Sequence, residues 1–383
     1  MAGTNGSSAN GSSTTGSSTT GSNGHADRPE PLGDLGVRSA AWAPLRSGFV
    51  DVRGTQVHVV RGGRPVADGG DPVPHLFVHG LGGGASNWFE VMAALGEDRE
   101  VIAMDLPGFG RTVPPRYSAA RVRANARFLP AFMDTLGIER AIVHGNSMGG
   151  MLTALLAGIA PERIDRAVMC APALPTAKSD LTHLPGAVLR RFAPFVVPGV
   201  GSNVLRAFWS RTDVDVLIAD ALALTVHEPD RLSPAMLAIM RENLQFAKRS
   251  PWRIESLAYA VESLVAALLG GRELTEGVHA MPSDVLVVWG DRDALVGRPV
   301  IEHLHGLRPD WDYGVLPDVG HTPMMEVPDR YLAVVGAWLA GVPVAGPAGV
   351  PGVLGAAEAF AMRDAVTSDA APVTPLAPVT PAG

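Results

Sequence analysis

The chain has 383 residues, a formal net charge of −7 and a single cysteine, Cys170. Its charges are interspersed, with no basic stripe and no aromatic RNA-binding pattern, so nucleic acid is excluded as an expected partner. One cysteine excludes an intramolecular disulfide. The sequence shows neither a secretory signal nor a charge-free apolar run of membrane-spanning length, so we expect a cytoplasmic protein without a transmembrane segment.

The two ends of the chain differ in composition from its middle. Residues 1–24 are almost entirely Gly, Ser, Thr, Asn and Ala, which bury too little apolar surface to offset the entropy of ordering. We therefore predict a disordered, low-complexity N-terminal tail over residues 1–40. Residues 343–383 are rich in Ala and Pro and predict a flexible C-terminal tail, with one short helix near 356–366.

Between the tails, short apolar segments alternate with helical patterns. A hairpin is predicted at 49–53 and 56–61, followed by buried strands at 75–79, 101–106, 141–144, 167–171, 285–289 and 311–316. Helices are predicted at 88–95, 119–136 and 329–340. This alternation indicates an α/β fold whose mostly parallel sheet has helices on both faces. Helical patterns without strands over residues 175–281 predict a cap inserted between two core segments, 41–174 and 282–342.

The segment Gly145–Gly150 reads G-N-S-M-G-G, and it lies between an apolar strand pattern and a helical pattern. A serine flanked by glycines two residues away on each side is typical of a tight strand–turn–helix that exposes the serine hydroxyl in a strained conformation. Gly145 and Gly149 occupy the two positions where a larger residue would clash. Ser147 is therefore the candidate nucleophile.

Acyl transfer by a serine needs a base, a group that orients the base, and donors for the developing oxyanion. In a parallel sheet the ligand site lies beyond the carboxyl ends of the strands, where His321 follows the last predicted strand. Asp293 and Asp291 both follow the strand before it, and Asp293 is the candidate orienting acid mainly because of the family resemblance given below. Asp291 is the alternative, which we expect to brace the turn.

The other histidines of interest carry no predicted catalytic role. His79 and His144 lie within apolar strands, so we interpret them as structural. His303 and His305 form an H-x-H pair without further ligands nearby in the sequence, so no metal site is predicted.

Two backbone N–H groups are predicted to form an oxyanion hole. One belongs to Met148, directly after the candidate nucleophile, and the other to Leu81, in the glycine-rich loop 80–84. Gly80 and Asn146 adjoin these donors and are predicted to contact substrate. No G-K-[ST] follows the glycine cluster, which argues against a phosphate-binding loop.

These motifs, in this order, resemble those of the α/β-hydrolases, in the large group of esterases and epoxide-hydrolase-like enzymes. The matching pieces are H-G-L-G at 79–82, D-L-P-G-F-G at 105–110, G-N-S-M-G-G at 145–150, G-D-R-D at 290–293 and G-H at 320–321. The resemblance implies the α/β-hydrolase fold with eight mostly parallel strands, a helical cap after the sixth, and a catalytic triad of Ser147, Asp293 and His321. A serine nucleophile separates the chain from epoxide hydrolases and haloalkane dehalogenases, which use aspartate there.

We therefore expect a hydrolase of small to medium apolar carboxylic esters that acts through an acyl-enzyme without cofactor or metal. The apolar preference rests on the segment Leu184–Phe208, although Arg190 and Arg191 there are an alternative site for a substrate carboxylate. G-N-S-M-G-G also resembles the carbon–carbon bond hydrolases of ring-cleavage pathways, which typically have Trp where this chain has Thr322. A cofactor-free perhydrolase and a non-catalytic ligand receptor are the remaining alternatives.

Overall fold

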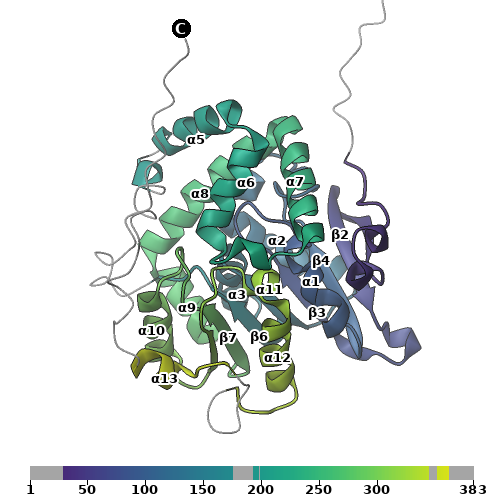
Figure 1. Ribbon diagram of the computed structural model, residues 1–383, viewed down its shortest axis with the longest axis vertical. Coiled ribbons are helices and arrows are strands. Elements are labelled where there is room, and N and C mark those ends of the chain that lie inside the picture. Colours follow the sequence, from purple (N-terminus) through teal and green to yellow (C-terminus); the bar gives the residue numbers. More distant parts are fainter. Residues whose placement is uncertain (1–28, 176–192, 198, 345–351, 362–383) are drawn as a thin grey trace, which may run out of the picture. The chain divides into compact units, whose positions relative to one another are not determined.

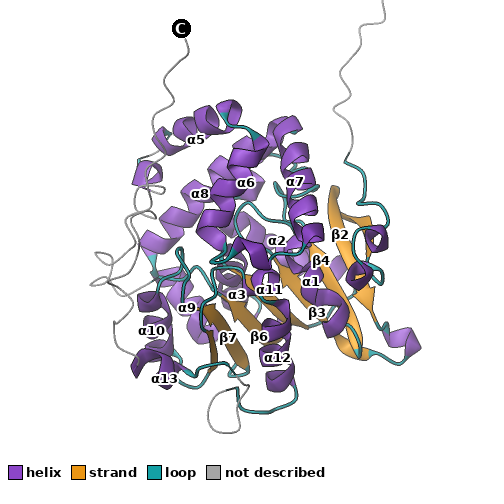
Figure 2. Ribbon diagram, in the orientation of Figure 1, coloured by secondary structure: helices purple, strands orange, loops and turns teal. Residues whose placement is uncertain are grey.

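The computed structural model describes residues 29–175, 193–197, 199–344 and 352–361. Within them, eight strands form one sheet in the order β1-β2-β4-β3-β5-β6-β7-β8 (Figures 1 and 2). The strands are β1 (Arg46–Val52), β2 (Thr55–Gly63), β3 (Asp71–Val78), β4 (Arg99–Met104), β5 (Ala141–Asn146), β6 (Ile164–Cys170), β7 (Val285–Gly290) and β8 (Asp312–Leu316). β2 is antiparallel to both neighbours and the other pairs are parallel, which confirms the predicted sheet.

Helices cover both faces of this sheet, as predicted. The core helices are α1 (Phe89–Leu95), α2 (Val122–Thr135), α3 (Met148–Ile159), α9 (Arg272–Ala280), α10 (Arg298–Leu307), α11 (Pro323–Glu326) and α12 (Pro328–Leu339). Successive side chains of each strand enter two separate apolar clusters because residues alternate between the faces. In β3, Leu76 and Val78 join the cluster beneath α2 and α3, whereas Phe77 joins the cluster beneath α1 and α12.

The insertion between β6 and β7 forms the helical cap. Its helices α5 (Val200–Arg211), α6 (Val214–Thr225), α7 (Pro234–Arg249) and α8 (Pro251–Gly270) lie at the upper end of the molecule in Figure 1. The last helix of the predicted cap, α9, packs against α3 in the core instead. A Cβ on Gly277 would lie 2.2 Å from the carbonyl oxygen of Ala154, so glycine permits this close approach.

Part of the cap prediction lies outside the described residues. This part includes Leu184, on which the expected apolar preference partly rests, and Arg190 and Arg191, the alternative site for a substrate carboxylate. Among the helices that the structure describes, none alone is long and apolar enough to cross a membrane. The consecutive helices α8 and α9, bent by 80° at their junction, pass that test only as a pair, by length and composition.

The predicted N-terminal tail over residues 1–40 is too long. The chain divides at residue 30, and the larger unit begins at Pro31. Leu32 and Leu35 are buried in the same apolar cluster as Trp42, and the backbone N–H of Leu32 donates to Ser47 Oγ at 2.8 Å. These two leucines supply the apolar surface that the preceding residues lack.

The C-terminal tail prediction is also partly wrong, although its short helix is confirmed. Helix α13 (Ala356–Ala361) buries Ala356 and Ala359 in the core cluster beneath α10. Just before it, Leu354 exchanges two backbone hydrogen bonds with Val315 of β8, at 2.8 and 2.9 Å. Residues 352–361 are therefore part of the folded body.

We expect truncation after Val344 to lower the free energy of unfolding by about 3 kcal/mol, because it removes Val353, Ala356 and Ala359 from the apolar core. Thermal unfolding measures the effect as a lower Tm. The matched control is truncation after Ala361, which keeps every described residue. Equal Tm values for the two truncated proteins would contradict the docking of this segment.

Candidate active site

Ser147 lies in the turn between β5 and α3. Its backbone has φ 54° and ψ −115°, and its N–H donates to the carbonyl of Cys170 in β6 at 3.0 Å. A Cβ on Gly145 would lie 2.6 Å from the carbonyl group of Gly149, and a Cβ on Gly149 would lie 2.1 Å from the carbonyl oxygen of Val78. Positive φ is costly for a residue other than glycine, so the surrounding strands must enforce the turn.

His321 and Asp293 form a buried pair at the ends of β7 and β8. Nδ1 of His321 lies 2.8 Å from Oδ2 of Asp293, and the two residues are 3% and 7% exposed. The other oxygen of Asp293 accepts hydrogen bonds from the N–H groups of Leu295 and Val296, at 2.8 and 2.9 Å. Because a carboxylate only accepts, Nδ1 carries the hydrogen and Nε2 is left as the basic nitrogen.

Asp291, the alternative acid, makes a different contact. Its Oδ1 accepts a hydrogen bond of 2.7 Å from the N–H of Asp318, which joins the turns after β7 and β8. Of the two aspartates, Asp293 is therefore the one that contacts the histidine.

Asn146 joins the serine turn to the loop of His321. Its Nδ2 donates to the carbonyl oxygens of Cys170 and His321, both at 3.2 Å. These contacts use both amide hydrogens, so this side chain braces the site, and its predicted contact with substrate stays a prediction. No hydrogen bond joins Ser147 Oγ to His321 Nε2 among the described residues; in ligand-free sites such bonds are often long and tighten when substrate binds.

Gly80 brings the predicted oxyanion loop against the serine. A Cβ at this position would lie 3.1 Å from the Cβ of Ser147 and 3.0 Å from Oδ1 of Asn146. The N–H of Leu81, next along the chain, donates no hydrogen bond within the described part of the molecule. Met148 is the first residue of α3, whose first-turn N–H groups lack helical acceptors. Both predicted donors are thus available at the edge that carries Ser147.

His79 fixes the peptide that carries the Leu81 N–H. Its Nε2 accepts from the N–H of Leu106 at 3.0 Å, so the hydrogen is on Nδ1, which lies 2.7 Å from the carbonyl oxygen of Gly80. The Gly80 carbonyl and the Leu81 N–H belong to one planar trans peptide and point in opposite directions. Holding the carbonyl therefore orients the N–H. Burial lowers the pKa of His79 to about 4, which keeps the ring neutral.

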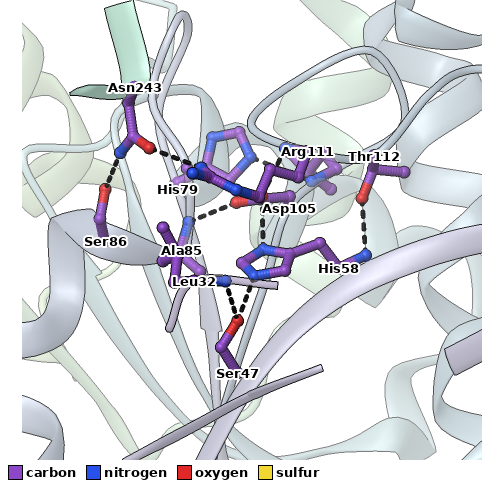
Figure 3. A network of polar contacts seen from close by, with 12 residues as sticks. Leu32, Ser47, His58, His79, Ala85, Ser86, Asp105, Arg111, Thr112 and Asn243 are labelled. Carbon is purple, nitrogen blue, oxygen red and sulfur yellow. Dashed lines mark hydrogen bonds and ion pairs between the residues drawn. The ribbon is translucent and has the colours of Figure 1, made fainter. Parts of the chain in front are cut away.

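Asp105, at the end of β4, holds the far end of the same loop (Figure 3). It accepts hydrogen bonds from the N–H groups of Ala85 and Arg111, both at 2.7 Å, and its Oδ2 lies 2.7 Å from Nδ1 of His58. Burial alone would raise the pKa of Asp105. The attraction and hydrogen bond of His58, together with His79 and the N–H of Ala85, outweigh burial and hold that pKa well below its ordinary value.

Glu326 ties the loop of His321 to the cap. Its buried carboxylate accepts from the N–H of Gly320 at 2.9 Å and from the N–H groups of His227 and Glu228 at 3.0 and 3.1 Å. Arg231, also in the cap, adds an ion pair at 3.2 Å. Neither Glu326 nor Asp105 has a role that the sequence alone predicts, although Asp105 lies within the D-L-P-G-F-G motif. Within the described ranges, no three His, Cys, Asp or Glu side chains gather closely enough to hold a metal ion.

An α/β sheet with a serine turn and a histidine–aspartate pair at one edge defines a hydrolase of the α/β class, and the comparisons agree. The family described as alpha/beta hydrolase fold matches residues 74–328. The chain belongs to this family, and it is a hydrolytic enzyme.

Two curated relatives cover most of the chain. A dihydrolipoyllysine-residue acetyltransferase component of an acetoin cleaving system from Cupriavidus necator is 30% identical over 81% of this chain and 73% of its own length. A 2-hydroxy-6-oxononadienedioate/2-hydroxy-6-oxononatrienedioate hydrolase from a Pseudomonas species is 29% identical over 70% of this chain and 88% of its own length. The chain spans only 62% of the corresponding acetoin-system protein of Pseudomonas putida.

Solved structures share the fold at lower identity. A putative lipase from Acinetobacter baumannii matches with a TM-score of 0.62 and 21% identity, over 80% of this chain and 94% of its own. A 2-hydroxy-6-oxo-6-phenylhexa-2,4-dienoate hydrolase from Rhodococcus matches with a TM-score of 0.61 and 23% identity, over 77% of this chain and 99% of its own. At these identities the likeness concerns the fold alone.

Because three histidines are buried, we expect acid to lower the stability of the folded state. Burial lowers the pKa of His79 to about 4 and of His75 to about 3, and that of His144 well below its ordinary value. In the unfolded chain these rings titrate near 6.5, so below that pH only the unfolded state gains their protons and stability falls as pH falls toward 4. We expect the free energy of unfolding, measured in urea, to drop by up to about 2 kcal/mol per histidine between pH 7 and pH 5. Equal values at both pH would contradict neutral burial.

Proposed function

We propose that this chain is a serine hydrolase that cleaves carboxylic esters through an acyl-enzyme. The observation that carries the proposal is the hydrogen bond between His321 and Asp293, at the sheet edge that also presents Ser147. A histidine held in this tautomer has its Nε2 free to take a proton from a hydroxyl. In this proposal, the N–H groups of Leu81 and Met148 form the oxyanion hole.

The proposed reaction uses these groups in order. His321 Nε2 takes the proton of Ser147 as Oγ attacks the ester carbonyl carbon, and the resulting oxyanion accepts hydrogen bonds from Leu81 and Met148. Collapse breaks the ester C–O bond, and His321 protonates the departing alcohol. A water molecule, deprotonated by His321, then attacks the acyl carbon. Collapse breaks the bond between that carbon and Oγ, His321 returns the proton to Oγ, and the acid leaves. Asp293 stabilises the imidazolium in both halves of the reaction.

The proposed substrate is a small to medium apolar ester. Support for this comes from the apolar composition of the cap segment 184–208, of which residues 193–197 and 199–208 are described. Each CH₂ that a pocket buries contributes about 0.8 kcal/mol, so an apolar pocket would favour longer acyl chains until it is full.

Carbon–carbon bond hydrolysis is the second candidate, because curated relatives are hydrolases of 2-hydroxy-6-oxo dienoates. Thr322, the residue after the proposed catalytic histidine, argues against carbon–carbon bond hydrolysis. Thr322 is 6% exposed, and both its N–H and its hydroxyl donate to the carbonyl of Thr225 at the end of α6, at 3.1 and 3.0 Å. In this chain, position 322 anchors the cap.

We expect the wild-type protein to hydrolyse p-nitrophenyl esters and to react covalently with a fluorophosphonate, and Ser147→Ala to lose both while keeping its Tm. Loss of a triad member lowers kcat by up to about 10⁶-fold in related enzymes. The measurement compares kcat/KM for acyl chains of two to twelve carbons with that for a 2-hydroxy-6-oxo dienoate. Labelling that persists in folded Ser147→Ala, or cleavage of the dienoate alone, would contradict the proposed ester hydrolysis.

The two aspartates of the G-D-R-D segment provide a matched pair. Asp293→Asn should lower kcat by up to about 10⁴-fold, because an amide in place of the carboxylate favours the wrong histidine tautomer. Asp291→Asn should leave kcat within a few-fold of wild type, because Asp291 contacts Asp318 and not His321. Steady-state ester hydrolysis by the two folded variants checks this order, and the reverse order would reassign the acid.

A further inference from the structure

Arg253 is a cap residue that reaches into the loops of the core. It lies in the first turn of α8, is 6% exposed, and stacks with its guanidinium 5.0 Å from the ring centre of Phe109. Its Nη2 donates to the carbonyl oxygen of Gly82 at 2.7 Å, and its Nη1 to that of Gly108 at 3.0 Å. One side chain thus joins the cap to the loop after β3 and to the loop after β4.

Within the part of the chain that the structure describes, the charge of Arg253 has no counterion in direct contact. Among the described residues, no carboxylate lies within ion-pair distance of it, and its hydrogen bonds go to backbone carbonyls. Burial lowers the pKa of its guanidinium to about 10, and the more distant charge of Asp105 offsets part of this effect, so Arg253 stays protonated at neutral pH. Desolvating a charge in this way is costly, which makes a purely space-filling role a poor explanation.

The loop that Arg253 holds is the one that carries the Leu81 N–H. Gly82 follows Leu81 directly and has φ +79°. Because glycine has no Cβ, this position can adopt other backbone conformations easily unless contacts hold it. On the other side of Leu81, His79 fixes the carbonyl of Gly80. The backbone around Leu81 is therefore held at both neighbouring carbonyls, once by the core and once by the cap.

We propose that Arg253 is a positioning residue of the oxyanion hole, through which α8 holds the Leu81 N–H in place. The inference rests on the proposed ester hydrolysis. Arg253 acts through the carbonyl of Gly82 and has no contact of its own with the reacting atoms. Close packing of α8 on the second loop supports the same conclusion, since a Cβ on Gly108 would lie 2.8 Å from the Cβ of Ser256.

The chain contains a matched control for this arginine. Arg308 is 8% exposed, donates to the carbonyl oxygens of Val278, Met281 and Pro282, and stacks 4.5 Å from the ring centre of Trp311. It makes the same kinds of contact, but to the end of α9 and the segment that connects α9 with β7, and unlike Arg253 it also forms an ion pair with Asp310 at 2.7 Å. Arg253→Met and Arg308→Met therefore both remove a buried arginine that stacks on an aromatic ring and donates to backbone carbonyls, and only the first changes the loop of Leu81.

We expect Arg253→Met to lower kcat for p-nitrophenyl esters about 10- to 100-fold, somewhat less than loss of an oxyanion donor, with KM within about threefold of wild type. The rate of phosphonylation of Ser147 should fall by a similar factor, because that reaction also develops charge on an oxygen in the hole. Arg308→Met should lower Tm without a comparable loss of kcat.

A second variant keeps the test decisive if Arg253→Met does not fold. Arg253→Lys keeps the charge and most of the stem, but one ammonium cannot reproduce the planar fork that spans two carbonyls, so kcat should still fall. Wild-type kcat in Arg253→Lys, or equal kcat losses in Arg253→Met and Arg308→Met, would overturn the proposal.

Two further outcomes separate the inference from its alternatives. A rise in KM confined to carboxylate-bearing esters, with kcat unchanged, would mean that Arg253 binds substrate, and would overturn the positioning role. If the wild-type protein shows no Ser147-dependent esterase activity, the proposed function itself fails, which is visible before any Arg253 variant is measured.

Discussion

The structure of the site depends on the close approach of neighbouring backbone segments around Ser147. There is no room for a Cβ at Gly145 or Gly149, because α3 and the end of β3 lie within van der Waals contact of the turn. Backbone strain of this kind persists only where the surrounding structure over-determines it. Here β5 is buried along its whole length and α3 is almost entirely buried, so the turn cannot relax in either direction. The serine is therefore fixed by the sheet, and the other groups must be brought to it by loops.

Loops lack the ladder hydrogen bonds of a sheet, and here buried charged groups take that role. Asp105 accepts from backbone N–H groups on two loops, Glu326 accepts from the N–H of Gly320 and from two cap residues, and Arg253 donates to carbonyls on two loops. Each charge is thus solvated by oriented backbone dipoles of the segments that it fixes. A charged acceptor or donor makes stronger hydrogen bonds than a neutral one, so a few side chains suffice to hold loops with many glycines. The cost is that removing any one of these groups leaves buried backbone groups without partners.

The parts of this arrangement that follow from local sequence could be predicted, and the parts that depend on tertiary contacts could not. The eight strands, the helices on both faces and the positions of Ser147, Asp293 and His321 at strand ends follow from apolar runs, glycine spacing and chain order. Leu32 and the segment of α13 fall within the predicted tails, because composition averaged over forty residues conceals two or three side chains that pack in the core. Arg253 has no local signature at all, since its role depends on which carbonyls lie beneath α8 in the fold.

The same contacts connect the cap to the loops that carry two of the proposed reacting groups. Arg253 connects it to the loop that carries Leu81, and Glu326 and Thr322 connect it to the loop that carries His321. A displacement of the cap relative to the sheet would therefore disturb the proposed oxyanion donor and the proposed base together, while Ser147, held by β5 and α3, would stay in place. On the proposed mechanism, the position of the cap sets the alignment of both the oxyanion donor and the base, so we expect a substitution in α8 or at the end of α6 to change the rate of the chemical step without touching substrate.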